Sequence, residues 1–179
     1  MIARLMILLT MLILTACSYT NPYWTKAKGT YFSYTATFHI RELLGDPMIE
    51  VLSSPDHVES FQISHLPSKN KTNTLAGYPI LSTGNLLEGV PLTQFQSTVF
   101  DKDSYVLGIT KRCGFFPDSA LRFTKKEEIV TILFSFSCNQ WIFIQGESEV
   151  YEDFDPARAP LLEIIKGLFP ENQKIQALK

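Results

Sequence analysis

The fold is decided by one stretch of sequence, Val130-Thr131-Ile132-Leu133-Phe134-Ser135-Phe136-Ser137-Cys138. Apolar side chains occupy every second position, and Leu133 is the one apolar residue at the positions between them. Because successive side chains of a β-strand point to opposite faces, this alternation predicts a strand with one buried face. Cys138 belongs to the apolar set, so it is predicted to point inward with the aromatic side chains.

Neighbouring segments extend this strand into a meander. Residues 120–124 predict a short strand, and the charged link Lys125-Lys126-Glu127-Glu128 suits a hairpin turn exposed to water. Residues 141–145 predict a third strand. Residues 155–169 then predict a helix with a single apolar stripe, and Pro170 ends it. The stripe consists of Leu161, Leu162, Ile164, Ile165 and Leu168.

Upstream segments supply further strands and another helix. Residues 48–52 and 57–63 predict strands, the first of them preceded by a turn signal at Gly45-Asp46-Pro47, and residues 78–81 predict a short strand. Pro91 opens a predicted helix, since proline suits the first helical position. Together these elements predict a single α+β domain, in which an antiparallel sheet with a C-terminal meander packs against two or three helices and a disulfide closes the fold.

The composition separates a short apolar leader from an ordinary globular domain. The chain has 179 residues and a net charge of −2, and thirteen of its first 16 residues are Met, Ile, Leu or Ala. Without that leader 163 residues remain, and the loss of Arg4 leaves 15 basic against 18 acidic residues, a net charge of −3. A mildly acidic domain without a basic cluster argues against nucleic-acid binding, which requires a footprint of Lys and Arg.

The leader has the properties of a secretory signal peptide. A positive start at Arg4 precedes an apolar run over residues 5–14, interrupted only by Thr10. About ten apolar residues are too few to span a hydrocarbon core of ~30 Å, which needs about 20. They match the apolar region of a signal peptide instead.

The leader ends in Leu14-Thr15-Ala16-Cys17, which resembles the lipobox of bacterial lipoproteins. The resemblance implies cleavage after Ala16, a diacylglycerol on Cys17 and an acylated new amino terminus, so that several acyl chains anchor the protein to a membrane. Ser18 resembles the residue found in lipoproteins passed on to the outer membrane, where the domain would face the periplasm. We therefore expect a signal peptide at 1–16, a lipidated cysteine and flexible tether at 17–30, and a globular domain at 31–179. The alternative is an ordinary signal peptide followed by an unmodified or core cysteine.

Lipidation of Cys17 would leave an even pair of cysteines, Cys113 and Cys138. An oxidising periplasm favours a disulfide between them. A metal site would need further Cys or His ligands close by, and the three histidines lie far upstream. A redox pair would require the Cys-x-x-Cys spacing, which is not present. We therefore expect a structural disulfide, with no metal and no cofactor.

A second resemblance is to a loose group of uncharacterised bacterial envelope proteins. The segment that carries it begins at Cys113, contains Pro117 and Leu121-Arg122-Phe123, and ends at Cys138. The resemblance covers residues 105–169. The chain departs from the group where Ser135 replaces the first cysteine of a Cys-Phe-x-Cys motif and where Asp118-Ser119 replaces Arg-His. The resemblance implies a fold and a compartment, and it implies no activity.

Few residues suggest catalysis. A hydrolase could use His57 beside Asp56, or His65 with a serine, but the sequence has no Gly-x-Ser-x-Gly nucleophile motif. Arg122 is predicted to point outward from its strand. An acidic cluster could serve acid–base chemistry or bind Ca²⁺, yet its spacing lacks the glycine turn of a calcium loop, so we predict a solvated surface. The cluster consists of Glu147, Glu149, Glu152, Asp153 and Asp155.

Two functional hypotheses follow from these patterns. The first is a non-catalytic envelope lipoprotein that binds a protein partner through the loop at 66–77 or through an exposed sheet edge. A sharper form of it is an inhibitor or immunity protein that guards the periplasm against a hydrolase. The second is a periplasmic hydrolase acting on cell-wall or lipid substrates, which would need a pocket with convergent titratable groups.

Overall fold

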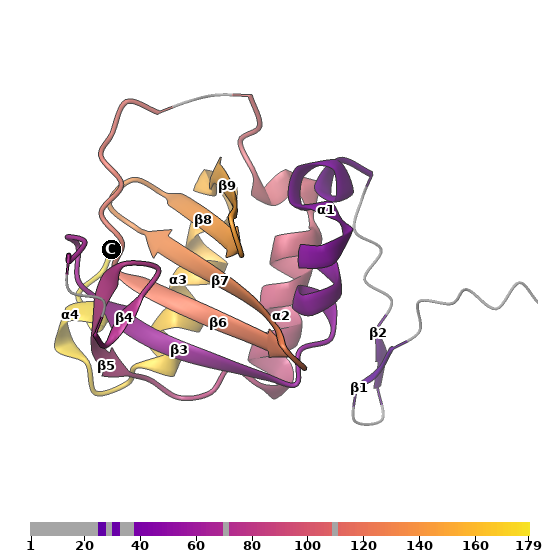
Figure 1. The fold of residues 1–179 in the computed structure, drawn as a ribbon, viewed down its shortest axis with the longest axis horizontal. Coiled ribbons are helices and arrows are strands. Elements are labelled where there is room, and N and C mark those ends of the chain that lie inside the picture. Colours follow the sequence, from indigo (N-terminus) through magenta and orange to yellow (C-terminus); the bar gives the residue numbers. More distant parts are fainter. Residues whose placement is uncertain (1–24, 28–29, 33–37, 70–71, 109–110) are drawn as a thin grey trace, which may run out of the picture. The chain divides into compact units, whose positions relative to one another are not determined.

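The computed structural model describes residues 25–27, 30–32, 38–69, 72–108 and 111–179 (Figure 1). The chain divides into two units, residues 1–33 and 34–179. In the first unit, β1 (Thr25–Ala27) pairs with β2 (Thr30–Phe32) as an antiparallel hairpin. Most of the predicted tether at 17–30 lies outside the described residues, so the tether stays a prediction. The residues of the predicted signal peptide, 1–16, and Cys17 lie outside the described residues.

A seven-stranded antiparallel sheet forms the centre of the second unit (Figure 1). Its order is β4-β5-β3-β6-β7-β8-β9, so the last four strands form a meander and β9 is an edge. The predicted strands at 57–63, 78–81, 120–124 and 141–145 are all confirmed. The strands are β3 (His57–Ile63), β4 (Thr74–Leu75), β5 (Tyr78–Thr83), β6 (Ser119–Lys125), β7 (Glu128–Ser135), β8 (Gln140–Gln145) and β9 (Ser148–Asp153).

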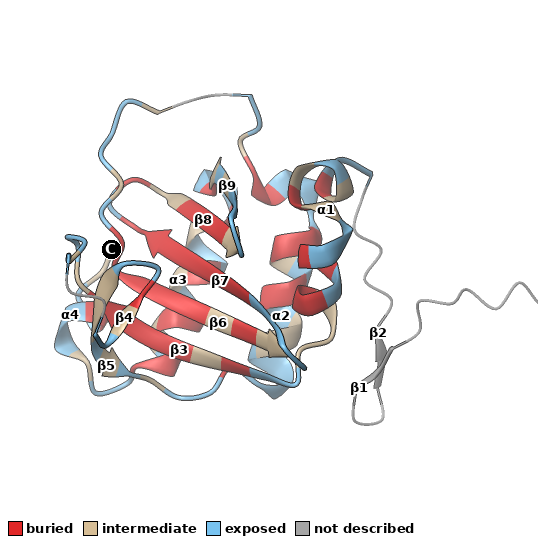
Figure 2. Ribbon diagram, in the orientation of Figure 1, coloured by how far each residue is buried: buried red, intermediate tan, exposed pale blue. Residues whose placement is uncertain are grey.

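Helices cover one face of this sheet, as the buried surfaces in Figure 2 show. They bury one large core against alternate positions of β6, β7 and β8, including Phe123, Phe134 and Trp141, each 0 % exposed. The predicted α+β class is thereby confirmed. The helices are α1 (Phe38–Ser53), α2 (Gly89–Phe100), α3 (Arg158–Leu168) and the short α4 (Gln173–Gln176), with 3-10 turns η1 (Lys102–Ser104) and η2 (Asp155–Ala157).

The predicted strand at residues 48–52 was wrong, because these residues belong to α1. Ile40, Leu44, Met48 and Leu52 recur every four residues and are all buried, which places them on one helical face. Gly45 interrupts the helix with φ 76° and ψ 154°. The predicted turn signal at 45–47 thus produces a kink within a helix.

The opposite face of the sheet carries a second, smaller core. It contains Leu133, the apolar exception in the β7 pattern, which is 1 % exposed. Tyr78, Ile80 and Ile144 are partly buried and pack against this core from outside. The buried members are Phe61, Ile63, Leu75, Ala120, Leu133 and Ile142.

Candidate functional site

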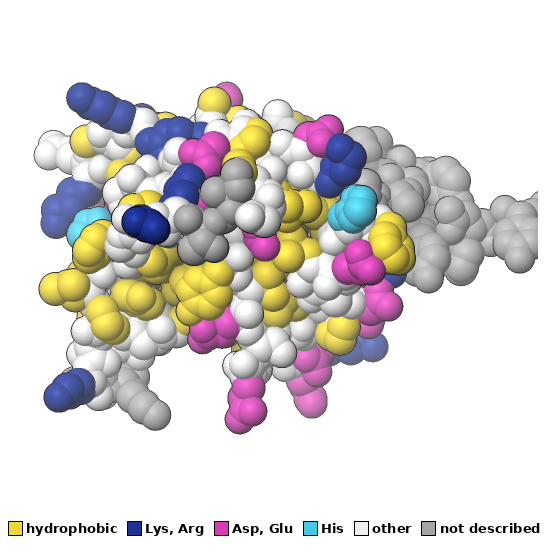
Figure 3. Space-filling model, turned by 90° about the horizontal axis from the view of Figure 1, so that it is seen from above, with side chains coloured by type: hydrophobic (Ala, Val, Ile, Leu, Met, Phe, Trp, Pro, Cys, Tyr) yellow, Lys and Arg dark blue, Asp and Glu magenta, His cyan; other side chains and the backbone are white. Residues whose placement is uncertain are grey.

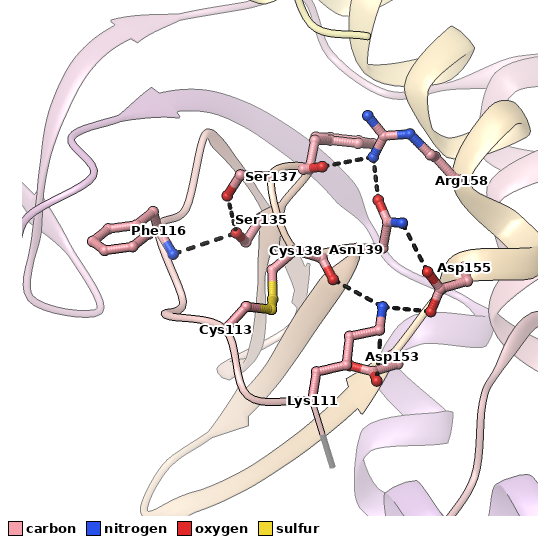
Figure 4. The surroundings of a disulfide bond; sticks show 11 residues. Lys111, Cys113, Phe116, Ser135, Ser137, Cys138, Asn139, Asp153, Asp155 and Arg158 are labelled. Carbon is pink, nitrogen blue, oxygen red and sulfur yellow. Dashed lines mark hydrogen bonds and ion pairs between the residues drawn. A yellow bond between two sulfur atoms is a disulfide. The ribbon is translucent and has the colours of Figure 1, made fainter. Parts of the chain in front are cut away.

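A disulfide joins the segment before β6 to the turn after β7 (Figure 4). Cys113 and Cys138 are bonded, with their Cα atoms 6.2 Å apart, as the sequence predicted. Cys113 is exposed, whereas Cys138 is buried, although β7 ends at Ser135 and Cys138 lies in the following turn. The bond therefore fastens an irregular surface segment to the turn after β7.

Lys111 adds a charged contact beside the disulfide (Figure 4). Its Nζ donates to the Cys138 carbonyl at 2.9 Å, forms an ion pair with Asp155 and lies 3.8 Å from the buried Asp153 carboxylate. Burial opposes ionisation of Asp155, but hydrogen bonds from Lys111 and Asn139 outweigh it and lower the pKa of that carboxyl. The predicted solvated acidic surface was thus wrong for Asp153, which is 2 % exposed. These charges stabilise the fold.

The candidate catalytic histidines lie apart from one another. His57 begins β3 and lies 3.7 Å from Glu59, whereas His65 follows the end of β3 and lies 3.9 Å from Asp118. His57 and Ile63 at the two ends of β3 are about 20 Å apart, and His65 lies two residues beyond Ile63. Both side chains are at least half exposed. The structure does not bring these groups together into a catalytic site.

Asp118 is a buried carboxyl beside the disulfide segment. It accepts a hydrogen bond from the Phe136 N–H at 2.8 Å. Burial raises its pKa, and the hydrogen bond from Phe136 and the charges of His65 and Arg158 oppose that rise. Its role is to satisfy the backbone of the turn after β7.

Arg122 lies on the sheet face opposite the helices, as predicted. Its Nε and Nη2 contact one carboxylate oxygen of Glu59 on the neighbouring strand at 2.9 and 2.8 Å. Its guanidinium also lies over the ring of Phe61, 5.0 Å from the ring centre. The charge of Arg122 is therefore neutralised within the sheet.

The loop at 66–77 contributes the hairpin formed by β4 and β5. Leu75 pairs with Tyr78 across a two-residue turn in which Ala76 has φ 48° and Gly77 has φ 83°. Two positive φ angles define the type I′ turn that suits a tight hairpin. Leu75 is buried and anchors the hairpin, while Leu66 is 66 % exposed.

The two ends of the sheet approach each other over the small core. The Tyr151 hydroxyl donates to Glu149 at 2.6 Å on β9, and this hydrogen bond, with burial and the Glu149 charge, raises the pKa of Tyr151 to about 12. Burial and the same Glu149 carboxylate raise the pKa of Tyr78 on β5. Tyr78, Ile80 and Ile144 pack against the same small core. Glu149 and Tyr151 pair with Ile144 and Ile142 on the neighbouring strand, so all of these residues belong to one surface. We call the surface formed by Tyr78, Ile80, Ile144, Glu149 and Tyr151 the tyrosine face.

Two surface clefts have linings that contain no residue of the tyrosine face. A cleft of about 380 Å³ separates the end of β5 from residues 168–172. A larger one, of about 620 Å³, opens between the α1 kink and the β6–β7 turn, and its lining contains no His, Cys or Ser. Its lining residues are Asp46, Pro47, Glu50, Val51, Lys125, Lys126, Glu127, Glu128 and Gln145.

Comparison of the chain with family models, curated proteins and solved structures gives no match. Over the described ranges, no three His, Cys, Asp or Glu side chains are grouped so that they could hold a metal ion. In the same part of the chain, the helices fall short of the length and apolar character that crossing a bilayer requires.

Proposed function

We propose that the protein is a lipid-anchored protein of the bacterial cell envelope whose domain binds a protein partner without catalysing a reaction. The leader and the motif Leu14-Thr15-Ala16-Cys17 support the anchor, and Ser18 supports an outer-membrane location facing the periplasm. The disulfide is consistent with an oxidising compartment.

One observation carries the binding proposal. The loop at 66–77 and the edge strand β9 were separate candidates in the sequence, and the tyrosine face combines residues from the hairpin of that loop with residues of β9. Tyr151 is exposed and Tyr78 is partly buried, and tyrosines beside apolar side chains are typical of protein interfaces. By contrast, His57 and His65 are each at least half exposed, and neither lines one of the two clefts described above. An inhibitor or immunity-like role is the sharper form of this proposal.

The anchor is tested by mass spectrometry of protein extracted from membranes. We expect residues 1–16 to be absent and Cys17 to carry the acyl chains. The matched control is Cys17→Ser, which should lose both the acyl mass and the membrane association. An unmodified Cys17 in the membrane fraction would overturn the proposed location.

Partner binding is tested by chemical crosslinking in intact cells that produce the protein natively. We expect one specific adduct, which is recovered again when the identified partner is tagged and used for the reciprocal capture. A chain reduced to the leader and residues 17–33 controls for contacts made by the anchored amino-terminal unit. If the full-length protein gives no specific adduct in either direction, the binding proposal fails.

A further inference from the structure

The tyrosine face combines an apolar surface with aromatic side chains. Ile80 and Ile144 are partly exposed and rest on the small core, while Tyr151 is 60 % exposed. Rigid aromatic side chains cover a large contact area at a small cost in conformational entropy. This face therefore has the side chains of an interface before any partner is considered.

Negative charge lies on the β9 side of this apolar surface, whereas the exposed Lys69 lies in the loop before β4. Residues 141–157 contain five carboxylates and no Lys or Arg. Lys111 neutralises the two that lie near the disulfide. Glu149 accepts a hydrogen bond from the Tyr151 hydroxyl. No ion pair involves Glu147 or Glu149 within the described part of the chain. The adjoining turn at 125–128 has two lysines and two glutamates, so it adds no net charge.

Figure 3 shows one side of the molecule with hydrophobic side chains gathered in its left and middle parts, carboxylates along its lower edge, and Lys and Arg side chains at its left and upper edges. An acidic border beside an apolar area is complementary to a segment that carries Lys or Arg next to apolar residues. Such a border would repel an anionic lipid surface. It would also oppose a symmetric contact between two copies, because that contact brings equivalent carboxylates together.

We infer that the tyrosine face docks a cationic segment of the protein partner, one that presents Lys or Arg to Glu147 and Glu149 and apolar side chains to Ile144 and Tyr151. This inference rests on the proposed function and names the chemistry of the partner.

Site-specific photocrosslinking in living cells tests the inference with the full-length protein. A photoreactive amino acid replaces Tyr151 or Ile144, and the matched control replaces Glu163, which is exposed on α3. We expect a protein adduct at the first two positions and none at Glu163. The crosslinked peptide of the partner should contain more Lys and Arg than Asp and Glu.

Charge variants then test the electrostatic part. With the photoreactive residue at Tyr151, Glu149→Lys should reduce the adduct about tenfold or more, and Glu149→Gln should reduce it less, because truncating a charge costs less than reversing it. Each variant must keep its disulfide on a non-reducing gel, which shows that it folds. Equal adduct yields from Glu149→Lys and the unsubstituted protein would overturn the electrostatic argument.

The remaining outcomes separate this inference from the proposed function. A protein adduct at Glu163 or Leu66, with none at Tyr151 and Ile144, overturns the docking site but keeps partner binding. An adduct to lipid, to a second copy or to an acidic peptide overturns the cationic partner. If no protein adduct forms at any of these positions, both the inference and the proposed function fail.

Discussion

Gly84 fastens the strand that carries Tyr78 to the rest of the sheet, and a single methyl group should disturb it. Its N–H donates to the Ser60 carbonyl at 3.0 Å. A Cβ at this position would lie 2.5 Å from the Ser60 Oγ, 2.6 Å from a ring carbon of Phe169 and 2.8 Å from the Leu168 carbonyl oxygen. Real Cβ atoms do not approach neighbours this closely, so the surroundings must move.

The magnitude of the effect follows from what surrounds that methyl group. Ser60 and Phe169 are buried, and the Ser60 hydroxyl donates to the Asn85 carbonyl at 2.7 Å, so it cannot rotate away without losing that bond. Overpacking costs about 1–3 kcal/mol, and the lost hydrogen bond costs about 1 kcal/mol more. We therefore expect Gly84→Ala to lower the free energy of unfolding by about 2–4 kcal/mol.

Urea denaturation measures this change directly, since the free energy of unfolding falls linearly with denaturant. The matched control is Gly167→Ala in α3, where a Cβ would meet no heavy atom within 4 Å. Alanine is more stable than glycine in a helix by about 0.5–1 kcal/mol, so this variant should be slightly more stable than the unsubstituted protein. A Gly84→Ala variant within about 1 kcal/mol of the unsubstituted protein would refute the packing argument.

Three further predictions concern the disulfide, a buried acid and a turn. Replacing Cys113 and Cys138 by alanine opens a loop that spans a sequence separation of 25 and should lower the free energy of unfolding by about 3.5 kcal/mol. The unsubstituted protein, once reduced, should unfold at the same urea concentration as this variant. A decrease of less than about 1 kcal/mol would contradict the prediction. Because burial raises the pKa of Asp118, the native state binds its proton before the unfolded chain does. The stability of the unsubstituted protein relative to Asp118→Asn should therefore increase as pH falls from neutral toward 3.8, and an unfolding series in which this difference stays constant would exclude it. Ala76→Asn should relieve the cost of a positive φ, about 1 kcal/mol, and raise the thermal midpoint by about 2–4 °C, whereas an unchanged midpoint would argue against strain at this turn.

The meander was predictable because its signal is local. Every second side chain from Val130 to Phe136 lies in the large core, and Leu133 lies in the small one, as its position in the alternation implies. The strands on either side of β7 were predictable because short turns connect them to it in the sequence. The disulfide was predictable from the number of cysteines, since lipidation of Cys17 would leave Cys113 and Cys138 as the remaining two.

Other elements were hidden because their signal depends on distant residues. The apolar residues at 48–52 fit a strand or a helix, and only Ile40 and Leu44 on the far side of Gly45 establish the helical face. The edge strand β9 has few apolar residues, because one of its sides faces water and carries carboxylates. Gly146, which has φ 59° between Gln145 and Ser148, was the local signal for its hairpin.

The candidate site could be predicted only in part. The loop and the sheet edge were both named from the sequence, but their meeting depends on how the sheet curves. Tyr78 and Tyr151 are separated by four intervening strands in the sheet order and interact only through space. The contact of Lys111 with Asp153 likewise joins segments whose proximity no local pattern reveals.

The two bonded cysteines differ in exposure, and this difference determines which of their sulfur atoms an external thiol attacks in thiol–disulfide exchange. An incoming thiolate reaches the sulfur of exposed Cys113 and not that of buried Cys138. The mixed disulfide therefore forms on Cys113, and Cys138 leaves as a thiolate, while the Cys138 carbonyl accepts a hydrogen bond from Lys111. Since Cys138 stays where its former partner can return, reclosure expels the attacking thiol and restores the same bond.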